Sequence, residues 1–182
     1  MRTYTILFML FFAGIIQIRA QQPSLEMVRE QFFTWDKTQD GALKLYESLE
    51  EADLTKDPVM MAYRGASSAA AAGSVNGVIN KLTYFNRGKS ELEKAVDMKS
   101  LDAEIRFLRL ATQINAPGFL GYTSDIKHDK ATIIQLFTSV NSNHPNAHLY
   151  LRICQFMLAY AELTSSEKNT VNQLIVKFNT KK

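Results

Sequence analysis

The 182-residue sequence has very little cysteine and proline and shows no strand-like alternation. Its one cysteine, Cys154, excludes a disulfide within the chain, so packing must supply the stability. The residues around Cys154 are largely apolar and predict a buried, unreactive thiol. The four prolines all fall at junctions between helical patterns, so none interrupts an element. No segment keeps up the period of two that indicates a half-buried strand.

The sequence also has no apolar run long enough to span a bilayer. The apolar stretch over residues 6–16 is eleven residues long, whereas a membrane helix takes about 20. With Arg2 before it and the small residue Ala20 after it, this stretch predicts a secretory signal peptide over residues 1–20. We therefore expect cleavage after Ala20, a periplasmic or secreted product, and no stable membrane insertion of the mature chain.

The sequence also has almost no excess of charge of one sign. Residues 1–20 hold Arg2 and Arg19 and no acid, which leaves 19 basic and 18 acidic residues and a net charge of +1 in residues 21–182. Nucleic-acid-binding proteins use concentrated positive charge to displace counterions, so we expect no nucleic-acid partner. The remaining 162 residues are a usual size for one domain with a hydrophobic core.

Helical patterns recur throughout residues 21–182 and predict a single all-α domain of about seven to eight helices. Asp57 before Pro58 is typical of a capped helix start, and the segment 164–167 matches a capping box. The segment from Pro145 to about residue 163 is apolar except on one narrow face, which predicts a mostly buried helix. Short turns favour stacked antiparallel hairpins, in a tetratricopeptide-like or an orthogonal arrangement. No 34-residue repeat consensus is visible.

Two segments carry specific packing predictions. The helix predicted over 58–72 has a stripe of small residues at helical spacing, which would let another helix approach closely. The stripe consists of Ala62, Gly65, Ala69 and Ala72. The segment 101–114 is apolar on two faces, so we expect it to contact neighbours on both sides at the centre of the domain.

The arginines are the best candidates for a binding site. Arg106 and Arg109 share with Gln113 the polar strip of segment 101–114, and Arg64 lies opposite the small-residue stripe. Guanidinium groups lining a groove between hairpins could clamp a carboxylate or a peptide backbone. The alternative is structural. Each arginine would then pair internally to set helix register, with an acidic partner among Glu104, Asp125 and Asp129.

The histidines and their acidic neighbours favour structural roles. His144 and His148 have the spacing of two metal ligands on one helix, but no further ligand is near in sequence, so we predict no metal site. Asp125, His128 and Asp129 crowd one helix start, where acidic side chains favourably meet the helix dipole. We predict no catalytic residue and no cofactor.

Several short motifs occur in order between about residues 57 and 134. They are Ala-Tyr-Arg-Gly-Ala at 62–66, Glu-Ile-Arg-Phe-Leu-Arg at 104–109, Asn-Ala-Pro at 115–117, Phe-Leu-Gly-Tyr at 119–122, and Ile126 followed by Asp129-Lys130. This part of the chain resembles a family of small exported bacterial proteins with no assigned activity. The resemblance implies a bacterial, extracytoplasmic, all-helical protein and supplies no catalytic residues.

These observations favour an exported helical module that binds another protein or a peptide, because stacked hairpins offer surface and little chemistry. Two other functions stay open at this point: an enzyme with dispersed catalytic residues, and a carrier of a small apolar ligand. A pocket of several hundred cubic ångströms would favour either of these, and an open concave surface would favour the binding module.

Overall fold

The computed structural model describes residues 23–179, so the predicted signal peptide over residues 1–20 lies outside the described residues. The structure is 73% helical, with eight α-helices and no strand within that range. The all-α prediction is confirmed. None of the helices described is both long enough and apolar enough to cross a bilayer.

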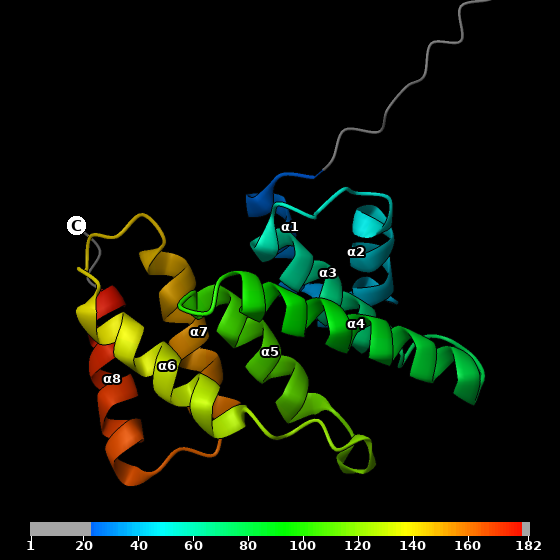
Figure 1. The fold of residues 1–182 in the computed structure, drawn as a ribbon. Coiled ribbons are helices and arrows are strands. Elements are labelled where there is room, and N and C mark those ends of the chain that lie inside the picture. The colour runs from blue at the N-terminus through cyan, green and yellow to red at the C-terminus, as the bar shows by residue number, and fades with distance from the viewer. Residues whose placement is uncertain (1–22, 180–182) are drawn as a thin grey trace, which may run out of the picture.

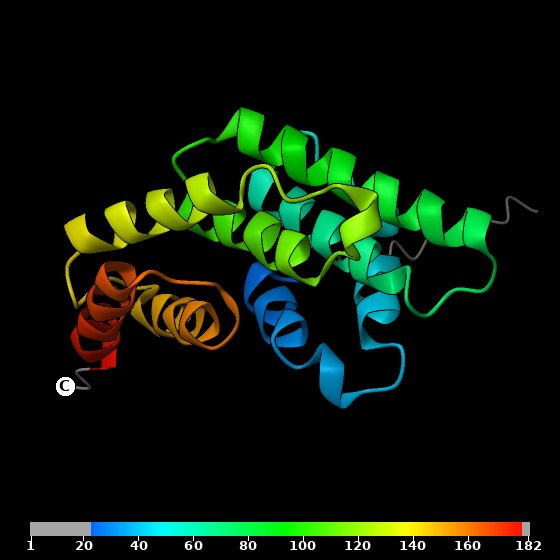
Figure 2. The ribbon, with the colours of Figure 1, turned by 90° about the horizontal axis from the view of Figure 1, so that it is seen from below.

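The helices follow one another through short connections (Figure 1). They are α1 (Leu25–Phe32), α2 (Gly41–Glu50), α3 (Pro58–Ala71), α4 (Val78–Met98), α5 (Ala103–Asn115), α6 (Ile126–Ser139), α7 (Ala147–Tyr160) and α8 (Ser165–Asn179), with short 3-10 turns η1 (Trp35–Lys37) and η2 (Gly118–Leu120). Neighbours in sequence pack together in the pairs α2–α3, α3–α4, α5–α6 and α7–α8. Helices α3, α4 and α5 run alongside one another, whereas α8 crosses the direction of α6 (Figure 2).

Side-chain caps fix the helix starts that the sequence indicates. Asp57 accepts a hydrogen bond of 3.0 Å from the backbone N–H of Met60, which satisfies an otherwise unpaired donor in the first turn of α3. The Thr164 hydroxyl accepts the backbone N–H of Glu167 at 3.2 Å, and the Glu167 carboxylate accepts that of Thr164 at 2.7 Å. The predicted capping box is confirmed.

Helix α5 lies at the centre of the bundle. Nine of its 13 residues are buried, and it contacts α3, α4 and α6. One continuous hydrophobic core includes buried side chains from all eight helices. Helix α7 differs from its prediction. Only four of its 14 residues are buried, because α7 packs mainly on α8 and leaves part of its outer face to solvent, with Tyr160 65% exposed.

Helices α3 and α4 meet backbone to backbone. A Cβ on Gly65 would lie 2.9 Å from the carbonyl oxygen of Gly88, and a Cβ on Gly88 would lie 2.4 Å from that of Gly65. The Ser68 hydroxyl donates to the carbonyl of Tyr84 at 2.9 Å across the same contact. The close approach predicted from the small-residue stripe is therefore confirmed, and its partner is α4.

Cys154 is free and has no exposed surface. Burial raises the pKa of its thiol to about 12, so the reactive thiolate is scarce near neutral pH. We expect the folded protein to resist iodoacetamide at mildly alkaline pH and to react fully once denatured, as mass spectrometry of the intact chain would measure. Native-state labelling as fast as that of the denatured chain would contradict this burial.

Candidate functional site

Arg106 and Arg109, two of the predicted binding residues, point from α5 to one carboxylate of α6. Arg106 Nη1 lies 2.7 Å from Asp129 Oδ1, and Arg109 donates to both oxygens of Asp129 at 2.8 Å. Asp129 has no exposed surface, and the two arginines are 6% and 4% exposed. These are the contacts of the structural alternative, with Asp129 as the shared partner.

The same network continues to α4 and to the turn after α5. Arg109 Nη1 lies 2.6 Å from Glu93 Oε2, and the Tyr122 hydroxyl donates to Glu93 Oε1 at 2.7 Å. Burial opposes the charge of Arg109, but Asp129 and then Glu93 outweigh it and hold the pKa of Arg109 above its usual value. Burial, aided by the neighbouring Glu93, raises the pKa of Tyr122. The network joins α4, α5 and α6.

Gln113 is on the same side of α5 and is 1% exposed. Its side-chain amide makes no hydrogen bond of standard geometry with the described residues, although it lies beside Asp125. The pKa of Asp125 is lowered mainly by the hydroxyl of Ser124, with smaller contributions from Arg109 and Gln113. Gln113 is thus a buried polar group next to the ion pairs.

Arg64 lies apart from the other three predicted residues. Its guanidinium pairs with Glu91 of α4 at 3.0 Å and donates to the carbonyl oxygens of Leu49 and Ala52 at the end of α2, at 3.2 and 2.9 Å. It therefore ties α3 to both α2 and α4. The structure brings Arg106, Arg109 and Gln113 together on α5 and places Arg64 elsewhere.

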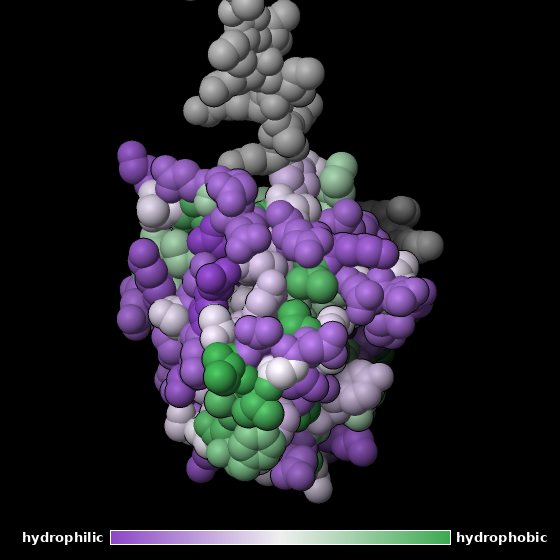
Figure 3. All heavy atoms as spheres, turned by 90° about the vertical axis from the view of Figure 1, so that its right-hand side faces the viewer, coloured by the Kyte–Doolittle hydropathy of each residue, from purple (hydrophilic) through white to green (hydrophobic). Residues whose placement is uncertain are grey.

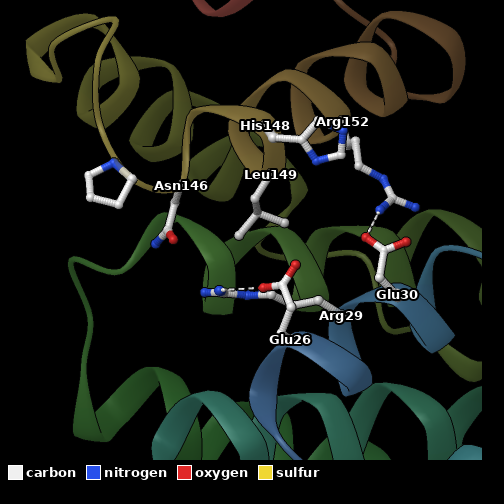
Figure 4. Close-up of a pocket in the computed structure, with 8 residues that line it drawn as sticks. Glu26, Arg29, Glu30, Asn146, His148, Leu149 and Arg152 are labelled. Carbon is white, nitrogen blue, oxygen red and sulfur yellow. Dashed lines mark hydrogen bonds and ion pairs between the residues drawn. The ribbon is translucent and has the colours of Figure 1, made fainter.

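An open cleft lined by guanidinium groups lies between α1 and the start of α7 (Figure 4). Its lining residues are Glu26, Arg29, Glu30, Pro145, Asn146, His148, Leu149 and Arg152. Carboxylates come from α1 and cations from both helices, and Leu149 points into the cleft from α7. The cleft therefore offers hydrogen-bond donors and acceptors around an apolar centre.

The inner side of this cleft is held rigidly. Arg29 makes two hydrogen bonds of 2.7 Å to the two oxygens of Glu104 in α5, and Tyr63 donates to Glu104 at 2.8 Å. The Glu104 hydrogen bond is the main cause of the raised pKa of Arg29. Paired, mostly buried charges of this kind are costly to separate. Arg29 is thus a fixed cation at the base of the cleft.

The outer side of the cleft is held weakly. Arg152 of α7 pairs with Glu30 of α1, and its guanidinium lies 4.0 Å from the ring centre of Phe33. The Glu30 side chain is 52% exposed. Ion pairs with a solvent-exposed partner contribute only about 0–1 kcal/mol, so the Glu30 carboxylate can leave Arg152 at little cost, while Arg152, only 20% exposed, stays on the Phe33 ring.

The sequence contains a partial signal for this cleft. His148 and Arg152, four residues apart in the sequence, share the narrow polar face of the helix predicted from Pro145. Arg29 and Glu30 sit on the polar side of the first helix. Nothing local indicates that these two helices face each other, because they are more than 110 residues apart.

The remaining titratable candidates have structural roles or stay at the surface. His144 Nδ1 accepts the backbone N–H of Asn146 at 3.1 Å, and its ring lies on Tyr150, whereas His148 is exposed at the cleft. Residues 23–179 contain no group of three or more His, Cys, Asp or Glu side chains placed to hold a metal ion. In the described part of the chain, His144 and His148 therefore have no third metal-ligating side chain beside them.

The fold and the cleft define an all-α helical bundle with an open, charged cleft between its first and seventh helices. Comparison with protein-family models, curated proteins and solved structures finds no match to the chain. The function is therefore inferred from the geometry of the cleft.

Proposed function

We propose that the chain is an exported helical module that binds another protein or a peptide, and that the α1–α7 cleft is its contact surface. One observation carries the proposal: acidic side chains of α1 face basic side chains of α7 across an open cleft. The periplasmic or secreted location is part of this proposal and depends on the signal-peptide pattern over residues 1–20.

A peptide segment suits this cleft chemically. Its carbonyl and carboxylate oxygens need donors, which Arg152, His148 and Asn146 supply. Its amide and ammonium groups need acceptors, which Glu26 and Glu30 supply from the opposite wall. Glu26 is 76% exposed and so remains accessible despite its contact with Arg29.

The dimensions of the cleft favour a peptide over an enclosed small molecule. Its free space is about 60 Å³, whereas pockets for small ligands typically enclose about 300–1,000 Å³. A peptide can lie along such a shallow surface without being enclosed. This comparison supports the binding module over a carrier of an apolar ligand.

The test is a charge swap across the cleft, with Glu30→Arg and Arg152→Glu combined. The swap keeps an ion pair between α1 and α7 and loses the contact of Arg152 with the Phe33 ring, so the melting temperature should fall by only about 2–4 °C, while the charge pattern presented to a partner is reversed. We expect the yield of partners crosslinked to the mature chain in its native envelope to fall at least about tenfold. Quantitative mass spectrometry would measure it.

A charge reversal at the exposed Lys168 of α8 provides the matched control. Lys168→Glu should leave both the melting temperature and the captured partners unchanged. Undiminished capture by the swapped variant would refute the cleft as the contact surface.

A further inference from the structure

The first two turns of α4 form an exposed apolar surface, here called the apolar tip. Val78, Ile79 and Leu82 share one face at helical spacing and are 73, 81 and 39% exposed. Figure 3 views the side of the molecule where α4 begins and shows an apolar area on it. In an otherwise well-packed protein, such a cluster marks an interaction surface.

The turn η2 adds a fourth apolar residue close to this end of the bundle. Phe119 is 86% exposed, while the adjacent Leu120 packs against a small cluster of Ala69, Phe85 and Tyr122, in which the rings of Phe85 and Tyr122 meet edge to face. Phe85 lies one turn beyond Leu82, so η2 is anchored next to the apolar tip.

The exposed charge on the apolar tip is positive, and acidic side chains that contact α4 farther along are already paired, Glu50 with Arg87 and Glu93 with Arg109. No acidic residue occurs between Asp57 and Glu91, and residues 110–124, which include η2, carry no charge at all. Lys81 is exposed within the tip, and Lys89 lies 5.0 Å from the ring centre of Tyr122. The first turn of α4 also lacks an acidic side chain to offset the positive end of its helix dipole.

We infer that the apolar tip docks the protein on the surface of an anionic phospholipid membrane. Aliphatic side chains flanked by lysine, on a projecting helix end, match the interface of such a bilayer, where apolar groups enter the acyl boundary and cations meet the headgroups. This peripheral docking is separate from the α1–α7 cleft and inserts no helix across the bilayer. The protein would bind its partner while held at a membrane surface.

A second copy of the chain fits the apolar tip less well. In a two-fold dimer through this surface, Lys81 and the positive end of α4 would approach their own equivalents, so like charges would meet. A membrane surface with negative headgroups supplies the opposite charge.

Vesicle sedimentation of the mature chain, residues 21–182, tests the inference. The wild type should pellet with phosphatidylcholine vesicles that contain phosphatidylglycerol, and much less with phosphatidylcholine alone. Ile79→Asp should weaken binding by more than about tenfold because it places a charge in the acyl boundary. Lys81→Glu should weaken it by about tenfold, on the anionic vesicles only.

Val176→Asp in α8 is the matched control, since Val176 is 69% exposed and lies outside the tip. It should bind vesicles like the wild type. Equal binding to both kinds of vesicle, an equal loss in Val176→Asp, or a dimer by light scattering that Ile79→Asp dissociates would each overturn the inference. Tip-dependent capture of a protein without vesicle binding would instead assign the tip to a protein partner. None of these outcomes depends on the cleft variants.

Discussion

Replacing Asp129 with alanine should destabilise the protein by about 3–5 kcal/mol. Asp129 is the shared partner of Arg106 and Arg109, and all three side chains are almost fully buried. Removing the carboxylate leaves Arg106 without an acidic partner in the described contacts and Arg109 with only the more exposed Glu93 and Asp125. Urea denaturation followed by circular dichroism would give the loss in free energy of unfolding.

Asp97→Ala serves as the control for this experiment. Asp97 also lies on a helix, α4, but it is exposed and forms no ion pair with the described residues. Its removal should change the free energy of unfolding by no more than about 0.5 kcal/mol. Equal losses in the two variants would show that the buried network does not stabilise the fold specifically.

Gly88→Ala should cost about 2 kcal/mol although alanine is the better helix former. The added Cβ would lie 2.4 Å from the carbonyl oxygen of Gly65 and 2.6 Å from the backbone nitrogen of Ala69. Backbone atoms cannot move aside as a flexible side chain can, so α3 and α4 must separate. Helix propensity alone would stabilise the variant by about 1 kcal/mol, so a net loss measures the steric effect.

The matched substitution for this test is Gly118→Ala in η2. A Cβ at Gly118 has no neighbouring atom within 4 Å, and its backbone is not in the left-handed region. We expect this variant to unfold within about 0.5 kcal/mol of the wild type. A Gly88→Ala protein as stable as the wild type would contradict the close contact of the two helices.

Much of the fold could be predicted from the sequence because its determinants are local. The Asp57 cap, the capping box at 164–167 and the small-residue stripe of α3 each act within a few residues or on one helix face. The two apolar faces of 101–114 likewise predict the central position of α5 correctly. The apolar sequence of α7 predicts more burial than the structure shows, because apolar composition does not show how many neighbours cover a helix.

The candidate site could be predicted only in part. The polar strip of Arg106, Arg109 and Gln113 marks residues of the buried network, and Asp129 is one of the partners that the structural alternative predicts. The α1–α7 cleft depends on the contact between Glu30 and Arg152, which are 122 residues apart. Spacing along a helix carries no information about such a long-range pair.

The central position of α5 determines how the protein unfolds. Helix α5 packs directly on α3, α4 and α6. Its charged residues Glu104, Arg106 and Arg109 also pair with side chains of α1, α6 and α4. Neither the segment before α5 nor the segment after it can complete the hydrophobic interior alone. Unfolding should therefore be cooperative, with the amino-terminal and carboxy-terminal helices losing their structure in a single transition.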